Sequence, residues 1–400
     1  MASLALAAIA ATPLTGSATS LANSPFGVKA LNSDGSGKYA IKGLKLGTDA
    51  VPGGNATEEP VTPAPTADPE PPADTDPYLV SMTIDTRMNG CTGSSFNLNV
   101  ADKDLRDATA APLPASGTID WGDNTTTSPL QTLDNKHSYA KAGVYTLKVN
   151  GTLGGLTGTT TKNCISSIDH FGSKTGIVTL QELFKDAYNI KQVAAPPTTL
   201  QNAQSMFSNA VNFNGNTSDW RLPNLKYASA MFASATRFNG DLSRLNPQSL
   251  LSTGSMFARA RSFNGDLTGW NMSKVTSVNQ MFMYADSFNG DISSWDLSSA
   301  QNFNAMFQGA TAFNRDISSW NMANATDTSY MFSSASSFNQ PIGSWNTANV
   351  TTMNAMFSGA TNFNQYIRSW DVKKVRVAAI FSTDSALASQ NRPLFNSGVG

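Results

Sequence analysis

The sequence predicts a mainly β protein with short helices, in which a small β-sandwich is followed by a solenoid of 25-residue turns. Two observations carry this prediction. Between residues 78 and 165, short runs of alternating apolar and polar residues are separated by turns rich in Gly, Asn and Asp, the pattern of half-buried strands. From residue 200 to 382 the same residue types return every 25 positions without an insertion, and such a fixed period is typical of stacked solenoids.

Residues 1–54 carry scattered apolar side chains among Gly, Ser and Ala, too few for an independent core. The first residues are mildly apolar, but the first positive side chain is Lys29, so the basic start of a secretory signal is absent. We therefore expect 1–54 to be a retained anchoring segment that binds a virion or envelope protein. No stretch of the chain approaches the roughly 20 apolar residues of a membrane span.

Residues 55–77 are predicted to be a linker. They contain seven prolines and six acidic residues and no basic one. Because proline fixes φ and removes a hydrogen-bond donor, we expect an extended, semi-rigid spacer that reaches about 70 Å at roughly 3.1 Å per residue. Such a spacer holds the C-terminal domains away from the anchoring segment.

Residues 78–165 form the predicted sandwich, and the two cysteines of the chain, Cys91 and Cys164, bracket most of it. A disulfide that closes this domain and a pair of buried thiols both fit this placement. A zinc site does not fit, because no CxxC motif or neighbouring His accompanies the cysteines.

The turn Asp120-Trp121-Gly122-Asp123 is followed by His137-Ser138-Tyr139 and by Gly143-Val144-Tyr145. This series resembles the PKD-like immunoglobulin sandwich, whose signature is a WGDG turn, then H-x-Y and G-x-Y. Asn124 replaces the second glycine of that turn, a mild departure because Asn also tolerates φ > 0. The resemblance implies a small β-sandwich that acts as a spacer or docking module.

Residues 166–382 form the predicted solenoid, with seven clear turns and degenerate caps, and 383–400 form a polar tail. Met-Phe pairs recur from Met206-Phe207 to Met356-Phe357, each followed by Ala, by Phe-Asn and, in all turns but one, by Trp. One turn is represented by Met281, Phe282, Ala285, Phe288, Asn289 and Trp295. An isolated turn cannot bury these side chains, so stacked turns must share one core.

The spacing inside a turn predicts local structure. Phe207, Ala210 and Phe213 are three residues apart, which predicts one face of a short helix or helical turn. The stretch 291–295 is predicted to be a short strand that stacks into a parallel sheet. The asparagines that follow the second Phe of each turn are expected to form a ladder in which each amide bonds the next and satisfies backbone groups at the bend.

The whole pattern resembles the BspA-type leucine-rich-repeat surface proteins, in their MF-x-x-A-x-x-FN-x-x-I-x-x-W form. The resemblance covers roughly residues 115–382 and includes the junction Ile168-Asp169-His170-Phe171-Gly172. It implies a leucine-rich-repeat-like solenoid on a surface-exposed adhesion or interaction protein of undefined ligand.

Three sets of residues are candidate sites. His137 and His170 are far apart in sequence and occupy motif positions typical of structure. The tryptophan column is expected to be core, and a sugar-stacking platform would require its rings to face outward. A column of aspartates predicts either a site for a cation or a basic partner, or a solvated edge beside Arg244 and Arg315; its members are Asp241, Asp266, Asp291 and Asp316.

The composition limits the function. A net charge of -1 and 14% charged residues argue against nucleic-acid binding, and no catalytic motif or cofactor fingerprint is present. We expect a non-enzymatic surface repeat protein without cofactors that assembles with others and binds a protein or glycan on a cell surface. A phage fibre or decoration protein on the virion is the first hypothesis. The alternatives are a bacterial cell-surface or extracellular adhesin of the BspA type and a carbohydrate-binding accessory module.

Overall fold

The computed structural model describes residues 74–91, 95–101, 115–131, 135–396 and 398–399. All of them lie in the second of the two units into which the chain divides, Pro72–Gly400. The predicted anchoring segment 1–54 and most of the predicted linker 55–77 lie outside the described residues. Within the described ranges, no helix has the length and apolar character needed to cross a membrane.

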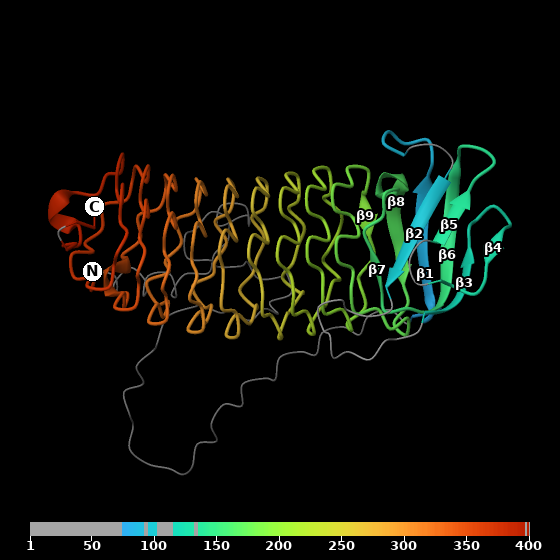
Figure 1. The fold of residues 1–400 in the computed structure, drawn as a ribbon, viewed down its shortest axis with the longest axis horizontal. Coiled ribbons are helices and arrows are strands. Elements are labelled where there is room, and N and C mark those ends of the chain that lie inside the picture. The colour runs from blue at the N-terminus through green and yellow to red at the C-terminus, as the bar shows by residue number, and fades with distance from the viewer. Residues whose placement is uncertain (1–73, 92–94, 102–114, 132–134, 397, 400) are drawn as a thin grey trace, which may run out of the picture. The chain divides into compact units, whose positions relative to one another are not determined.

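The first part of this unit contains two sheets (Figure 1). The larger has the strand order β4-β3-β6-β1-β8-β9 and the smaller the order β5-β2-β7. The strands are β1 Leu79–Asp85, β2 Ser95–Ala101, β3 Ser116–Asp120, β4 Thr126–Thr127, β5 Asn135–Ser138, β6 Val144–Thr152, β7 Gly155–Thr157, β8 Ile165–Phe171 and β9 Gln192–Val193. The prediction of a mainly β protein is confirmed.

Alternating side chains explain why these segments pair. In β1 the side chains of Val80, Met82 and Ile84 are fully buried, and β1 runs antiparallel to β6 with Met82 opposite Leu147. Strand β2 likewise buries every second residue. Because side chains point alternately to the two faces of a strand, one face of each strand contributes to the core.

The larger sheet leads directly into the repeats. Strand β8 is antiparallel to β1 on one side and parallel to β9 on the other. Isolated parallel bridges continue from Gly155 to Thr179, from Thr179 to Asn202 and onward to Val377, with one interruption. We call residues 178–396 the coil stack, and Figure 1 shows its coils following one another from β9 to the C-terminal end.

Backbone hydrogen bonds join each coil to the next. Alternate N–H groups donate forward, from Gln280 to Asn304 O at 2.8 Å, from Phe282 to Met306 O at 2.9 Å and from Tyr284 to Gln308 O at 2.7 Å. Between these residues the chain makes tight turns within the coil. The turns place residues at two positions of every full coil in the left-handed region of φ; these are Ser205, Ala230, Ser255, Gln280, Ala305, Tyr330, Ala355 and Ile380, and Asn209, Ser234, Arg259, Tyr284, Gly309, Ser334, Gly359 and Asp384.

The prediction of a short helix or helical turn over Phe207, Ala210 and Phe213 is wrong. Ala210 N–H donates to Phe207 O at 3.0 Å and Phe213 N–H to Ala210 O at 3.0 Å, so both are turn contacts. A helix cannot form because Asn209 has φ of 59° and donates its N–H to the next coil. The described helices are three-residue 3₁₀ segments, η1 Lys162–Cys164, η2 Ile342–Ser344 and η3 Ser389–Asn391.

The predicted strand at 291–295 is also wrong. This segment is a turn in which Trp295 N–H donates to Ile292 O at 3.2 Å. The carboxylate of Asp291 accepts the N–H of Ser293 at 3.0 Å, which bends the chain locally. Parallel pairing occurs elsewhere in the coil, at positions such as Ser277 and Asn302.

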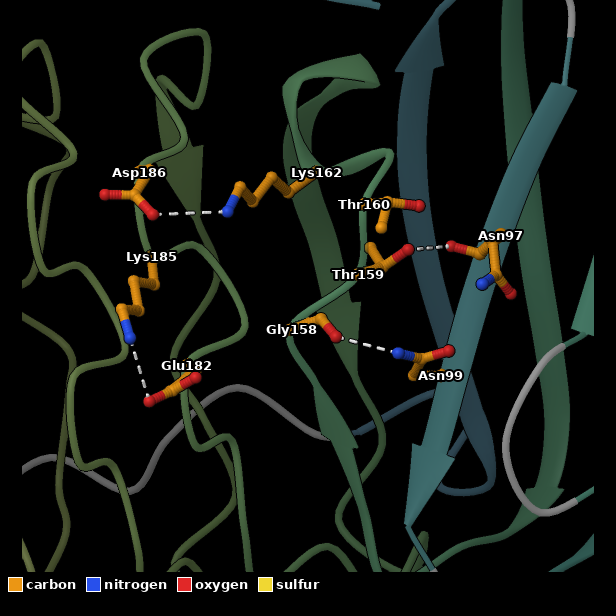
Figure 2. A pocket seen from close by; sticks show the side chains of 9 residues that line it. All are labelled: Asn97, Asn99, Gly158, Thr159, Thr160, Lys162, Glu182, Lys185 and Asp186. Carbon is orange, nitrogen blue, oxygen red and sulfur yellow. Dashed lines mark hydrogen bonds and ion pairs between the residues drawn. The ribbon is translucent and has the colours of Figure 1, made fainter.

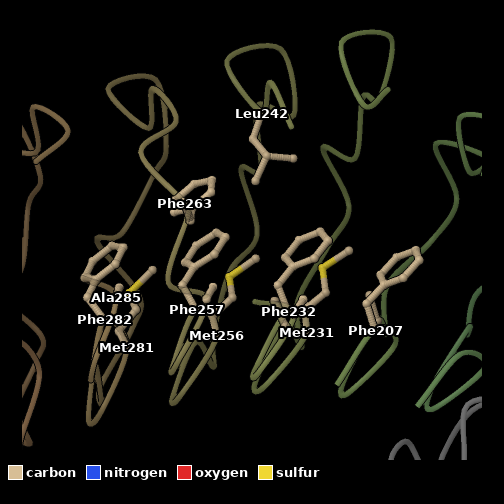
Figure 3. Packing of buried hydrophobic residues seen from close by; sticks show 14 of the residues in the cluster. Phe207, Met231, Phe232, Leu242, Met256, Phe257, Phe263, Met281, Phe282 and Ala285 are labelled. Atoms are coloured by element: carbon tan, nitrogen blue, oxygen red, sulfur yellow. The ribbon is translucent and has the colours of Figure 1, made fainter. Parts of the chain in front are cut away.

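Stacked aromatic rings fill the coil stack (Figure 3). The ring of Phe282 lies 5.7 Å from that of Phe257, 5.6 Å from that of Phe307 and 3.8 Å from that of Phe288 in its own coil. Ala285 is fully buried beside these rings. The core is therefore continuous from coil to coil, as the sequence predicts for turns that cannot bury their side chains alone.

The stack is irregular between the coils that begin at residues 250 and 275. No parallel bridge joins Ser252 to Ser277, although the bridges on both sides are present. Within the described residues, two buried side-chain groups of this coil have no hydrogen-bond partner, the hydroxyl of Thr253 and the indole N–H of Trp270. The coil before it carries Leu245 where the other full coils carry Trp.

This irregularity predicts different outcomes for two matched substitutions. Trp295 donates its indole N–H to Leu267 O at 3.0 Å, a carbonyl that also accepts the backbone N–H of Trp270 at 3.2 Å. Trp295→Phe therefore removes one buried hydrogen bond and is expected to cost about 0.5–1.5 kcal/mol. Trp270→Phe removes a donor that has no partner and is expected to cost less. Urea denaturation of the two variants measures the difference, and an equal or larger loss for Trp270→Phe would contradict it.

Candidate functional site

We call the part of the chain that carries β1 to β8 the β domain. Its aromatic motif residues meet in one cluster. The ring of His137 stacks on Trp121 at 4.9 Å, and its Nε2 lies 2.8 Å from a carboxylate oxygen of Asp123. The Tyr139 hydroxyl donates to Trp121 O at 3.0 Å, and burial raises the pKa of that hydroxyl. Asn124 has φ of 68°. The cluster is thus a packed, hydrogen-bonded turn in which His137 has a structural partner.

The second histidine lies beside the start of the described chain. His170 Nε2 is 3.0 Å from Asp76 O and 3.2 Å from a carboxylate oxygen of Asp74. Asp74 also accepts the N–H of Ser173 at 2.6 Å. These contacts fasten the segment before β1 to the end of β8, and they do not bring His170 to His137.

The cysteines form a disulfide in the structure, with 4.9 Å between their Cα atoms. Cys91 follows β1, and Cys164 ends η1 directly before β8. The side chain of Asn189, in the first coil of the coil stack (residues 178–199), donates to Asn89 O and to Asn163 O, both at 2.8 Å. The disulfide therefore lies where the β domain and the first coil are hydrogen-bonded to each other.

An open cleft of about 460 Å³ lies between β2, the segment after β7 and the first coil (Figure 2). Its lining is polar and consists of Asn97, Asn99, Gly158, Thr159, Thr160, Lys162, Glu182, Lys185 and Asp186. The Asn99 amide donates to Gly158 O at 2.7 Å, and the Thr159 hydroxyl donates to Asn97 O at 2.7 Å. These bonds join β2 to the segment that leads into η1.

The charged groups of the cleft are paired with each other. Lys162 Nζ donates to Asp186 at 3.4 Å, and Lys185 Nζ donates to Glu182 at 3.1 Å. Asp186 also accepts a hydrogen bond from the Asn209 amide at 3.0 Å. That bond, together with Lys162, outweighs burial and lowers the pKa of Asp186. The cleft is a polar joint whose carboxylates already have partners.

The four predicted aspartates occupy equivalent, exposed turns. Each carboxylate accepts the backbone N–H two residues later at 2.9–3.0 Å, in Asp241, Asp266, Asp291 and Asp316. In the described part of the chain, no three or more His, Cys, Asp or Glu residues are grouped so that they could hold a metal ion. The four aspartates therefore have the geometry of carboxylates that close a turn.

These turns predict a pH dependence. Hydrogen bonds from Ser293 and Ser318 lower the pKa values of Asp291 and Asp316, and the bond from Ser298 does the same for Asp296. A lowered folded-state pKa contributes stability above the unfolded value of about 3.9, and this is lost as pH falls through the folded value. Replacing the three by Asn keeps an oxygen acceptor and is expected to flatten the fall in melting temperature below about pH 4. Thermal melts of both proteins between about pH 6 and about pH 2 measure this dependence. An unchanged slope of melting temperature against pH would contradict the prediction.

The tryptophans lie inside the stack. Trp295 is 3% exposed and Trp370 is 4% exposed. The indole N–H groups of Trp320, Trp345 and Trp370 each donate at 3.1 Å to a carbonyl of the preceding coil. Because the rings face inward, the column is part of the core and is no sugar-stacking platform.

The asparagine ladder is present, but its bonds differ from the expected ones. The side-chain oxygen of Asn264 accepts the backbone N–H of Asn289 at 2.8 Å, and that of Asn289 accepts the N–H of Asn314 at 3.0 Å. The bonds therefore run from amide oxygen to backbone, and not from amide to amide. They link the bends of successive coils along an accessible edge.

Sequence reasoning missed the cleft. Its residues come from β2, from a turn and from the imperfect coil Leu183-Phe184-Lys185-Asp186-Ala187, which lie far apart in sequence. The one signal in the sequence was that this coil departs from the repeat. Phe184 nevertheless stacks on Phe207 at 5.2 Å, so the coil belongs to the stack.

Two stretches of the chain, residues 178–295 and 285–393, match the family described as "Mycoplasma protein of unknown function, DUF285". Together they cover more than half of the 400 residues and coincide with the coil stack. No curated protein and no solved structure matches the chain. The match fits the BspA-type repeat that the sequence resembles. The chain therefore belongs to the DUF285 family of BspA-like repeat proteins.

Proposed function

We propose that this chain is a non-enzymatic repeat protein displayed on a surface, where the sides of its coil stack bind a protein or glycan of a cell surface. The observation that carries the proposal is the use of every large recurring side chain in stacking. Phe282, Phe288 and Ile292 are fully buried and Trp295 nearly so. The sides carry polar and charged residues, among them the exposed Arg259, Arg261 and Lys374, which suits contact with a partner better than chemistry on a substrate.

We further propose that the described chain consists of a spacer domain and a displayed repeat domain. The cluster of Trp121, His137 and Tyr139 supports a PKD-like sandwich as the spacer. The 25-residue period, the parallel bridges and the continuous core support a leucine-rich-repeat-like solenoid as the displayed part. The paired charges of the cleft support a structural joint and no catalytic role.

Two carriers fit this proposal. The first is a virus particle, on which the chain would be a fibre or decoration protein anchored through 1–54. The second is a bacterial envelope, to which the BspA-type family is closer. In both cases the stack is the presented surface, and copies assemble on the carrier.

Immunogold electron microscopy with antibodies raised against the purified chain tests the proposal. Gold on the outside of intact cells or released particles is the expected result, and label confined to the cell interior would overturn it. Gold on particles supports the virion, whereas gold on the envelope without particles supports the adhesin. Pre-immune serum on the same sections is the control.

A further inference from the structure

The asparagine ladder does not use the backbone carbonyl groups of its own asparagines, so these carbonyls can accept hydrogen bonds from other donors. We call the asparagines at this edge the asparagine row; they are Asn214, Asn239, Asn264, Asn289, Asn314, Asn339 and Asn364. Each side-chain oxygen accepts the backbone N–H of a residue in the next coil. The backbone carbonyl of each residue takes no part in that ladder.

In the C-terminal half of the row the protein caps these carbonyls itself. Arg315 Nε donates to Asn289 O at 2.6 Å. Gln340 Nε2 donates to both Asn314 O, at 2.9 Å, and the Asn314 side-chain oxygen, at 2.8 Å. The following two members are capped in the same bidentate way, Asn339 by Gln365 and Asn364 by Asn391.

In the N-terminal half the equivalent caps are missing. Gly240, Gly265 and Gly290 occupy the position that Arg315 and Gln340 hold in later coils. Because glycine has no side chain, this position cannot cap the carbonyls of the three asparagines concerned, which are Asn214, Asn239 and Asn264. All three asparagines are exposed. We call this stretch the open half of the row.

A column of aspartates follows the open half. Besides the hydrogen bonds from Ser293, Arg315 at its boundary lies close enough to lower the pKa of Asp291. Each of the three glycines is followed by an exposed aspartate, in order Asp241, Asp266 and Asp291. In the two later coils that glutamine caps, the equivalent positions hold Pro341 and Tyr366. At the boundary, Asp316 follows Arg315, and Arg244 lies in the coil of Asp241. Each uncapped asparagine carbonyl is therefore followed by a coil that carries an aspartate. In the coils whose glutamine caps the carbonyl, that aspartate is absent.

We propose that the open half of the asparagine row is a docking surface for arginine side chains of an extended basic segment in a partner protein. A guanidinium is planar and always charged, and its forked N–H groups reach two acceptors at once. A bidentate contact of this kind is what Gln340 supplies to Asn314 within the chain. The aspartates add charge complementarity, which favours arginine over a neutral amide or a hydroxyl. This proposal rests on the proposed display function and names the chemistry of the partner.

The test measures binding of a labelled peptide of alternating Arg and Thr to the full chain by fluorescence anisotropy. The double variant Asp266→Asn and Asp291→Asn keeps the turn acceptors and is expected to weaken binding about tenfold, the size of one charge-assisted hydrogen bond. The control is Asp296→Asn with Asp371→Asn, because these carboxylates close equivalent turns outside the row. It makes the same charge change and is expected to leave Kd unchanged.

Two further variants move the boundary of the open half. Gly265→Gln is expected to cap Asn239 and weaken binding; its backbone is outside the left-handed region, and the new Cβ would lie 2.9 Å from the Phe263 ring, which must shift slightly. Gln340→Gly is expected to uncover Asn314 and tighten binding.

Equal Kd values across all variants, or equal binding of a peptide with Glu in place of Arg, would overturn the proposal. Binding of a neutral β-glucan oligomer that is insensitive to the aspartate changes would overturn it in favour of a glycan. Immunogold labelling is independent of these measurements, so the two proposals can fail separately.

Discussion

Replacing Phe282 by alanine is expected to lower the free energy of unfolding by about 3–5 kcal/mol, the usual cost of deleting a fully buried phenyl ring. The ring contacts Phe257 in the preceding coil, Phe307 in the following coil, and Phe288 and Trp295 in its own coil. A cavity at this point weakens two inter-coil interfaces at once. In a repeat protein the stability is nearly a sum of such nearest-neighbour interfaces.

The position of the coil in the stack provides the control. Phe381 lies in the last coil, where its ring contacts Phe357 at 5.4 Å and Phe395 at 5.1 Å. Phe381→Ala is expected to fray the end with a smaller loss, because it weakens one coil interface and the cap. Urea denaturation followed by tryptophan fluorescence, with hydrogen exchange of both variants, distinguishes these outcomes. Equal losses at both positions would contradict a stack stabilised by neighbouring coils.

The sequence was sufficient for the parts of the fold that depend on side-chain chemistry. Phe, Ala and Trp at fixed positions of a 25-residue period require a shared core, and the rings of Phe257, Phe282 and Phe307 do stack in register. Asparagine at a recurring bend predicted a ladder, and the ladder is present. Burial of the tryptophans followed from the same argument.

The backbone path inside a coil was not predictable from the same pattern. Spacing of three residues is shared by helices and by successive tight turns, and only the left-handed φ values separate them. Those φ values fall on residues such as Gln280, Tyr284 and Ala305, which carry no left-handed signal of their own. The inter-coil hydrogen bonds impose the conformation, and such bonds are invisible in a single coil.

The cleft and the open half of the asparagine row were hidden for a different reason. Both depend on the residues that lie beside them in the neighbouring coil or sheet. The sequence shows that Gly265 and Gln340 are equivalent, but only the structure shows that Gln340 reaches back to the carbonyl of Asn314. A repeat therefore reveals its core in the recurring positions and its binding chemistry in the positions that change.

Removing the disulfide is expected to cost about 2–5 kcal/mol, since it closes a long loop and so restricts the unfolded chain. Cys91 and Cys164 are separated by 73 residues, and a loop of that length corresponds to roughly 4 kcal/mol in the chain-entropy description. The double variant Cys91→Ala and Cys164→Ala deletes both thiols and leaves no free cysteine among the described residues. Its melting temperature should fall below that of the oxidised protein.

The place of the disulfide determines which region responds. The loop that carries Cys91 and the 3₁₀ segment that carries Cys164 are both hydrogen-bonded to Asn189 of the first coil. Loss of the crosslink should therefore raise hydrogen exchange in the β domain and in the first coil, while the coils around Phe282 keep their protection. A reductant should reproduce the effect in the native chain and have none on the double variant. If hydrogen exchange instead rises equally along the whole stack, the junction and the coils unfold as one unit, and the prediction is contradicted.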